Sequence, residues 1–211
     1  MIILRDDPGY HFHVSDRLYL EIPVVYGYHA SIMNLRIETD RLLLRPLELS
    51  DAERMFILDS DPVVCQYLGT QPVESNEVSK KIIQGIIQQY EDTGVGRLAV
   101  ILKDEDKMIG WCGLKWHKEE VNGVKEFYDL GFRFIPQYWG KGIATEASRA
   151  VVNEAFLTLP IDKIYAYADT RNKASIRVLE KIGFQYIKLF YDRDELCSWY
   201  ELSRQSYSDH R

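Results

Sequence analysis

The sequence contains few cysteines and no long apolar run. Cys65, Cys112 and Cys197 are odd in number and far apart, so they form neither a disulfide framework nor a zinc-ligand pattern. No apolar stretch approaches the roughly 20 residues that a membrane helix needs. Asp6 and Asp7 stand where a secretory signal would carry basic residues before an apolar run. We therefore expect a cytoplasmic protein with no bound metal and no association with membranes.

An excess of positive charge is also missing. The 26 Lys and Arg residues are outnumbered by 32 Asp and Glu residues, which gives a net charge of −6. This balance argues against non-specific binding of nucleic acid and favours a cationic partner such as an amine. With 211 residues, of which 46% are apolar and 12% aromatic, the chain can bury one sizeable core. We expect a single folded domain.

The first part of the chain differs from the rest. Residues 1–32 are rich in Tyr and His but show little helical or strand periodicity, so we interpret them as an N-terminal extension, either an appendage or an interface arm. His11 and His13 lack a third ligand and do not predict a metal site. Residues 33–206 form the expected domain, and residues 207–211 are a tail.

Spacings of apolar residues divide the domain into strands and helices. Ser50 and Glu53 have the spacing of a capping box, which predicts a helix from Asp51. Gly94 and Gly183 follow predicted helices as C-terminal caps. The other expected helices are Asn76–Tyr90, a segment after Gly142 and a segment from Asn172 to Lys181; the expected strands are Leu42–Leu47, Leu98–Lys103, Met108–His117, Phe127–Phe134, Lys163–Asp169, Phe184–Tyr191 and Cys197–Leu202. Strands outnumber helices and both hairpins and crossovers are needed, so we expect an α/β fold with a mixed sheet and helices on both faces.

The segment Pro136–Ala147 connects a strand to a helix through Gly140 and Gly142. Such a turn leaves backbone N–H groups without partners at the helix start, with the positive end of the helix dipole behind them. The glycines let a ligand approach the backbone closely. The segment therefore predicts a phosphate-binding site.

A glycine-containing motif and four further sequence blocks carry a resemblance to a known family. Gln137–Gly142 matches the Q/R-x-x-G-x-G/A motif of the GNAT superfamily of acyl-CoA-dependent N-acetyltransferases. The other blocks are Thr39–Pro46, Asp129–Phe132, Gly142–Ala147 and Asn172–Phe184. Together they resemble the branch that contains the ribosomal-protein N-terminal alanine and serine acetyltransferases, and the resemblance covers about residues 35–203.

This resemblance implies a fold, a cofactor and a set of contacts. The fold is a mostly antiparallel twisted sheet of about 6–7 strands with a splay, and the cofactor is acetyl-CoA as acetyl donor. Its pyrophosphate is expected on the turn, its pantetheine arm along the strand, and further contacts at the start of the last helix. The implied cofactor-binding residues are Phe132, Phe134, Gln137, Gly140, Lys141, Gly142, Ile143, Ala144, Asn172 and Ser175. Lys141 is equally compatible with a solvated turn lysine, and Asn172 with a helix cap.

The resemblance also suggests catalytic residues. Asp129 stands where related enzymes often carry Glu, so it is a candidate base, acting directly, through water or by binding the ammonium. The alternative is a strand carboxylate paired with a nearby Arg or Lys. Leu179 replaces the Tyr that many relatives use as acid, which directs attention to Ser175 as a proton relay. His117 is either a second candidate base or an ordinary surface histidine at a strand end.

Two classes of function follow. The first is an enzyme that transfers acetyl directly to a primary amine, on a protein N-terminus or a small molecule, in a ternary complex. The second is a non-catalytic acyl-CoA-binding regulatory module. The acceptor pocket is expected around Pro62–Pro72 and Lys118–Glu126, and the protein is a monomer or a homodimer.

Overall fold

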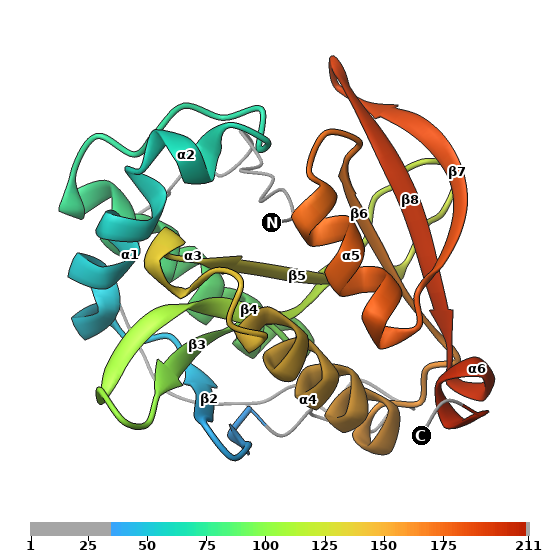
Figure 1. The fold of residues 1–211 in the computed structure, drawn as a ribbon, viewed down its shortest axis with the longest axis horizontal. Coiled ribbons are helices and arrows are strands. Elements are labelled where there is room, and N and C mark those ends of the chain that lie inside the picture. The colour runs from blue at the N-terminus through green and yellow to red at the C-terminus, as the bar shows by residue number, and fades with distance from the viewer. Residues whose placement is uncertain (1–34, 210–211) are drawn as a thin grey trace, which may run out of the picture.

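A computed structural model describes residues 35–209, so the expected extension at residues 1–32 lies outside the described part. The strands form one sheet in the order β1-β2-β3-β4-β5-β6-β8-β7 (Figure 1). The strands are β1 Ile37–Glu38, β2 Leu42–Pro46, β3 Arg97–Leu102, β4 Lys107–His117, β5 Phe127–Phe134, β6 Lys163–Asp169, β7 Gln185–Asp192 and β8 Glu195–Ser203. The helices are α1 Ala52–Asp59, α2 Pro62–Cys65, α3 Asn76–Thr93, α4 Ile143–Thr158, α5 Lys173–Ile182 and α6 Arg204–Asp209, with short 3-10 turns at Leu49–Asp51 and Pro136–Tyr138.

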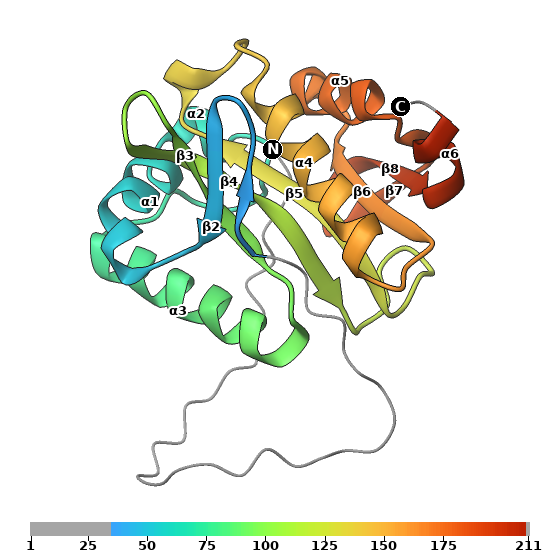
Figure 2. The ribbon, with the colours of Figure 1, turned by 90° about the horizontal axis from the view of Figure 1, so that it is seen from below.

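The sheet is mixed and mostly antiparallel, which confirms the expected fold class. Only β5 and β6 run parallel, and they pair at a single position, Asp129 opposite Tyr165. The described sheet has eight strands rather than six or seven, because Ile37 and Glu38 pair with β2 as a short edge strand. Figure 2 shows α1 and α3 on one side of the strands and α4 and α5 on the other.

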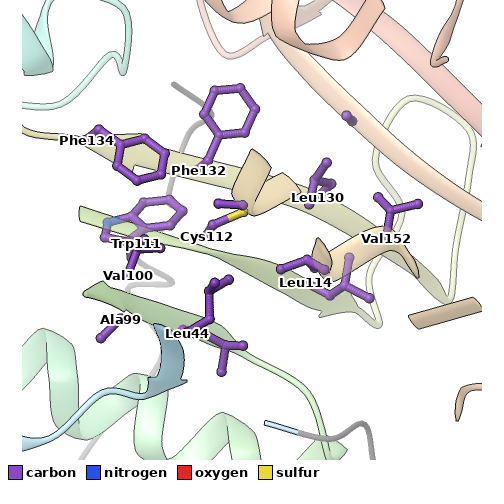
Figure 3. Close-up of a cluster of buried hydrophobic side chains, with 14 of the residues drawn as sticks. Leu44, Ala99, Val100, Trp111, Cys112, Leu114, Leu130, Phe132, Phe134 and Val152 are labelled. Carbon is purple, nitrogen blue, oxygen red and sulfur yellow. The ribbon is translucent and has the colours of Figure 1, made fainter. Parts of the chain in front are cut away.

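The core follows the alternation of side chains along the strands. Leu114 and Leu130 point from β4 and β5 toward Val152 of α4, and all three are fully buried (Figure 3). Cys112 lies in the same layer, fully buried beside Ser148. The alternate positions of these strands carry buried charged groups on the opposite face of the sheet.

The two predicted glycine caps are confirmed. Gly94 and Gly183 end α3 and α5 in left-handed conformation, with φ of 70° and 103°. The predicted capping box of Ser50 and Glu53 is wrong. A 3-10 turn precedes α1, and the N–H of Glu48 donates to the Asp51 carboxylate at 2.8 Å. The observed capping box, Glu48 and Asp51, lies two residues earlier, and Arg45 holds the Asp51 carboxylate there with two contacts of 2.8 Å.

Among residues 35–209, no helix has the length and apolar character to cross a membrane.

Candidate functional site

The predicted phosphate-binding turn forms between β5 and α4. Gly140 and Gly142 have φ of 74° and 77°, a left-handed backbone that side chains other than glycine rarely adopt, and α4 begins at Ile143. Within the described residues, the N–H groups of positions 140 to 144 donate no hydrogen bond. These donors lie at the start of a 16-residue helix, whose dipole adds positive potential. The turn thus offers a site for an anion.

Arg41 and Glu146 hold this turn in place. The Nε of Arg41 donates to Glu146 at 2.7 Å, and its Nη1 donates to the carbonyl of Lys141 at 3.1 Å. Thr39 donates its hydroxyl to the same carboxylate at 2.6 Å. Burial alone would raise the pKa of Glu146, but the bonds from Thr39 and Arg41 outweigh it and lower that pKa. The role of Arg41 was not predicted, although it lies in one of the blocks that carry the resemblance.

The other side chains of the turn have distinct positions. Gln137 and Lys141 are exposed, and the Lys141 ammonium lies 5.5 Å from the centre of the Tyr138 ring. The indole of Trp139 donates to the carbonyl of Phe134 at 2.6 Å, which ties the turn to the end of β5. Phe132 and Phe134 themselves are buried.

The edge of β5 opens beside this turn. Beyond Asp129, no residue of β5 pairs with β6, although the two strands are neighbours in the sheet. Because β5 and β6 are parallel, the helices that follow them, α4 and α5, begin at the same end of the sheet. Asn172 caps α5 by accepting a bond from the Ser175 N–H at 3.1 Å. The structure therefore brings the predicted cofactor residues to one end of an open splay.

Asp129 is fully buried in a cluster of charged and titratable side chains. Both of its carboxylate oxygens are 3.0 Å from Nη2 of Arg97, and Oδ1 is also 2.9 Å from Nε2 of His117. Arg97 Nη1 donates to the backbone carbonyl of Asp129 at 3.0 Å. Gly131 makes room for this guanidinium, since a Cβ there would come within 2.5 Å of its carbon. Every oxygen of Asp129 is therefore already bonded.

This cluster sets the charge of Asp129. Burial alone would raise its pKa, but the Arg97 guanidinium, followed by His117, holds that pKa well below the usual range. The carboxylate is a weak proton acceptor as it stands. The expected alternative, a strand carboxylate paired with an Arg, describes its contacts, and its catalytic role stays a prediction.

A second buried ion pair lies on the same face of the sheet. Arg133 of β5 bonds Asp59 of α1, and Trp111 stands between Arg133 and Arg97, with guanidinium carbons 5.2 and 5.5 Å from its ring centre. A cavity of about 50 Å³ adjoins Asp59, Arg133 and Cys65. Sequence reasoning missed both arginines; the available signal was a charge within an otherwise apolar strand.

His117 is buried, with 8% of its surface exposed, so its interpretation as a surface histidine is wrong. Its ring stacks on Phe127 at 4.8 Å with an interplanar angle of 6°. Leu179, which takes the place of the acid expected from the resemblance, is fully buried. Among residues 35–209, no group of three His, Cys, Asp or Glu side chains is arranged to hold a metal.

Comparison with known proteins identifies the family. The model of the acetyltransferase (GNAT) domain matches residues 41–185, well over half of the chain. The chain belongs to the GNAT acetyltransferase superfamily. It is 32% identical over 157 residues to an uncharacterized N-acetyltransferase, p20, of Bacillus licheniformis, covering 74% of this chain and 86% of that protein. It is 31% identical over 142 residues to the spermidine N(1)-acetyltransferase of Escherichia coli K12, covering 67% and 71%.

Solved structures agree with this GNAT assignment. A GNAT-family acetyltransferase from Bacillus anthracis superimposes with a TM-score of 0.67 at 25% identity, covering 81% of this chain and 99% of that one. The turn after β5 and the open edge of β5 therefore lie in a GNAT domain. The match does not single out the ribosomal-protein branch.

Proposed function

We propose that this GNAT domain transfers the acetyl group of acetyl-CoA to a primary amine by direct attack in a ternary complex. One observation carries the proposal: a turn with unbonded N–H groups directly follows a strand whose edge opens beyond Asp129. A phosphate group fits the turn, and an extended amide-bearing chain fits the strand edge. Coenzyme A contains both, joined in one molecule.

The proposed contacts follow the order of the cofactor. The pyrophosphate lies on the N–H groups of the turn, where Lys141 adds positive charge. The pantetheine arm runs along β5 from Phe134 toward Phe132 and contacts Asn172 and Ser175 at the start of α5. The proposed cofactor contacts are Phe132, Phe134, Gln137, Gly140, Lys141, Gly142, Ile143, Ala144, Asn172 and Ser175.

The chemistry requires a neutral amine. Its lone pair attacks the thioester carbonyl carbon, an N–H group of β5 stabilises the oxyanion, and the C–S bond then breaks to release CoA as a thiolate. Asp129 serves this reaction as the buried carboxylate beside the splay, and Ser175 as a relay that returns a proton to the sulfur. No acetyl-enzyme forms in this scheme.

Two acceptor classes have support. The blocks shared with the ribosomal-protein branch favour a protein or peptide N-terminus. The similarity to a spermidine acetyltransferase favours a polyamine, which also suits a net charge of −6. Both present a primary amine.

The cytoplasmic location, and the choice between monomer and homodimer, stay predictions.

A CoA-release assay tests the proposal. The purified full chain is incubated with acetyl-CoA and, separately, with spermidine, with peptides beginning in Ala or Ser, and with aminoglycosides. We expect thiol release above the rate of acetyl-CoA hydrolysis, and one acetylated amine detected by mass spectrometry.

The second candidate, an acyl-CoA-binding module, is favoured by the buried Leu179 and the fully bonded Asp129. It predicts measurable acetyl-CoA binding without amine-dependent thiol release.

A further inference from the structure

The cluster around Asp129 contains one side chain that is not completely sealed from solvent. Arg97 and Asp129 are sealed from solvent, with side-chain exposures of 1% and 0%, whereas His117 keeps 8%. The Nε2 of His117 is bonded to Asp129. Its Nδ1 has no hydrogen-bond partner within residues 35–209 and is not one of the fully buried unbonded atoms. His117 is therefore the member of the cluster that joins the buried carboxylate to solvent.

The surroundings of His117 fix the ring in one orientation. Phe127 stacks flat on it, and Phe127 in turn contacts Tyr165, the residue of β6 that pairs with Asp129. The charged and titratable groups around it are Asp129 on β5, Arg97 on β3 behind that carboxylate, Lys115 on its own strand and Tyr165 on β6. The ring thus lies next to the point where β5 and β6 separate.

A carboxylate bonded to one imidazole nitrogen orients the ring and stabilises the imidazolium that forms when the other nitrogen takes a proton. Arg97 keeps Asp129 ionised, so the carboxylate does not take that proton itself. We propose that His117 is the general base of this enzyme and that Asp129 is its positioning residue. This inference rests on the proposed acetyl transfer and names the group that neutralises the acceptor.

The proton balance is simple. An N–H bond of the acceptor ammonium breaks, and its proton joins Nδ1 of His117, which gives an imidazolium beside the Asp129 carboxylate. The amine lone pair then forms the C–N bond to the thioester carbonyl, and the C–S bond breaks with its electrons on sulfur. A proton from the acylated nitrogen neutralises the thiolate, and His117 releases its own proton to water before the next turnover.

His117→Gln and Phe127→Leu form a matched test. The glutamine keeps an N–H donor for Asp129 but does not titrate, whereas the leucine removes the stacking partner and leaves the imidazole. With spermidine and an Ala-initiated peptide as probes, we expect His117→Gln to lower kcat/KM for the amine by about 10²–10⁴-fold. KM for acetyl-CoA should stay unchanged. The wild-type fall in rate toward acid pH should disappear in His117→Gln and persist in Phe127→Leu.

Chemical rescue separates catalysis from packing. In His117→Gly, added imidazole should restore a large part of the lost rate, because it fits the space left by the ring. A His117→Gln enzyme with wild-type rate and pH profile overturns the inference and leaves acetyl transfer standing; so does a slow His117→Gly enzyme without rescue. A wild-type protein that releases no thiol with any amine overturns both proposals.

Discussion

Asp129 links the stability of this protein to its proposed chemistry. Its carboxylate balances a fully buried guanidinium, so Asp129→Asn leaves Arg97 charged and unpaired in the core. We expect a loss of about 3–5 kcal/mol in the free energy of unfolding at pH 7, measured by urea denaturation. Turnover should also fall, with little change in KM for acetyl-CoA, because the orientation of His117 is lost.

The pH dependence of this effect has a defined sign. The pKa of Asp129 in the folded protein lies below its ordinary value of 3.8, so the carboxylate contributes its full stability above that value. The contribution is lost as pH falls from there through the folded pKa. The difference between wild type and Asp129→Asn should be constant down to about pH 4 and shrink below it. Glu77→Gln, in an exposed pair with Lys80, is the control and should cost less than about 1 kcal/mol.

Gly142 tests the phosphate-binding turn. A Cβ at this position meets nothing closer than 3.7 Å, so the cost of Gly142→Val is backbone strain at φ 77° rather than a clash within the protein. We expect a stability loss of about 1–2 kcal/mol and at least about a tenfold loss in acetyl-CoA affinity by calorimetry, because the side chain blocks the approach of phosphate.

Gly123→Val is the matched control for that experiment. Gly123 has φ 82° and open space around it, but it lies in the turn between β4 and β5. Its replacement should cost similar stability and leave acetyl-CoA affinity unchanged. Equal losses of affinity in both variants, or in neither, would contradict the assignment of the turn to the pyrophosphate.

At the scale of elements, substitutions of the N-cap residues of α5 and α3 distinguish a role in cofactor binding from a role in helix stability. Asn172→Ala removes the bond to the Ser175 N–H, and Ser75→Ala removes the bond to the Val78 N–H at the start of α3. Each should cost about 1 kcal/mol of stability, measured by thermal unfolding. Only Asn172→Ala should also weaken acetyl-CoA binding; equal affinities in the two variants would leave Asn172 as a helix cap alone.

Elements were predictable where local spacing decides them. Strands β5 and β6 begin and end at the predicted residues, because alternation and flanking turns specify them. The cluster around Asp129 was not predictable. Arg97 lies 32 positions from Asp129 in the chain, and the two side chains meet only because of the register of β3, β4 and β5. For His117 the sequence left a candidate base and a surface histidine open, because a strand end gives no sign of the Phe127 ring that stacks on it.

At the scale of the whole molecule, the sheet consists of two parts joined weakly at the site. Strands β1 to β5 and strands β6 to β8 share one ladder position between β5 and β6, while α4 and α5 pack on each other beside it. A ligand that lies between β5 and β6 would add backbone contacts to both the strand edge and the helix starts. Acetyl-CoA should therefore stabilise the fold as a whole as well as fill a site.

Binding of acetyl-CoA should change both the amide hydrogen exchange and the thermal unfolding of the protein. Alternate N–H groups of residues 131–134 point away from β4, toward the open edge, and should exchange rapidly without ligand. At about 100 times its dissociation constant, acetyl-CoA should add about 2.7 kcal/mol of stability, which raises Tm by roughly 5–10 °C for a domain of this size. Hydrogen exchange read by mass spectrometry should show new protection at residues 131–134 and 140–144 in the same sample. A rise in Tm without protection at either segment would place the cofactor elsewhere. At the same concentration, a tenfold weaker affinity limits the stabilisation of Gly142→Val to about 1.4 kcal/mol, roughly half that of the wild type.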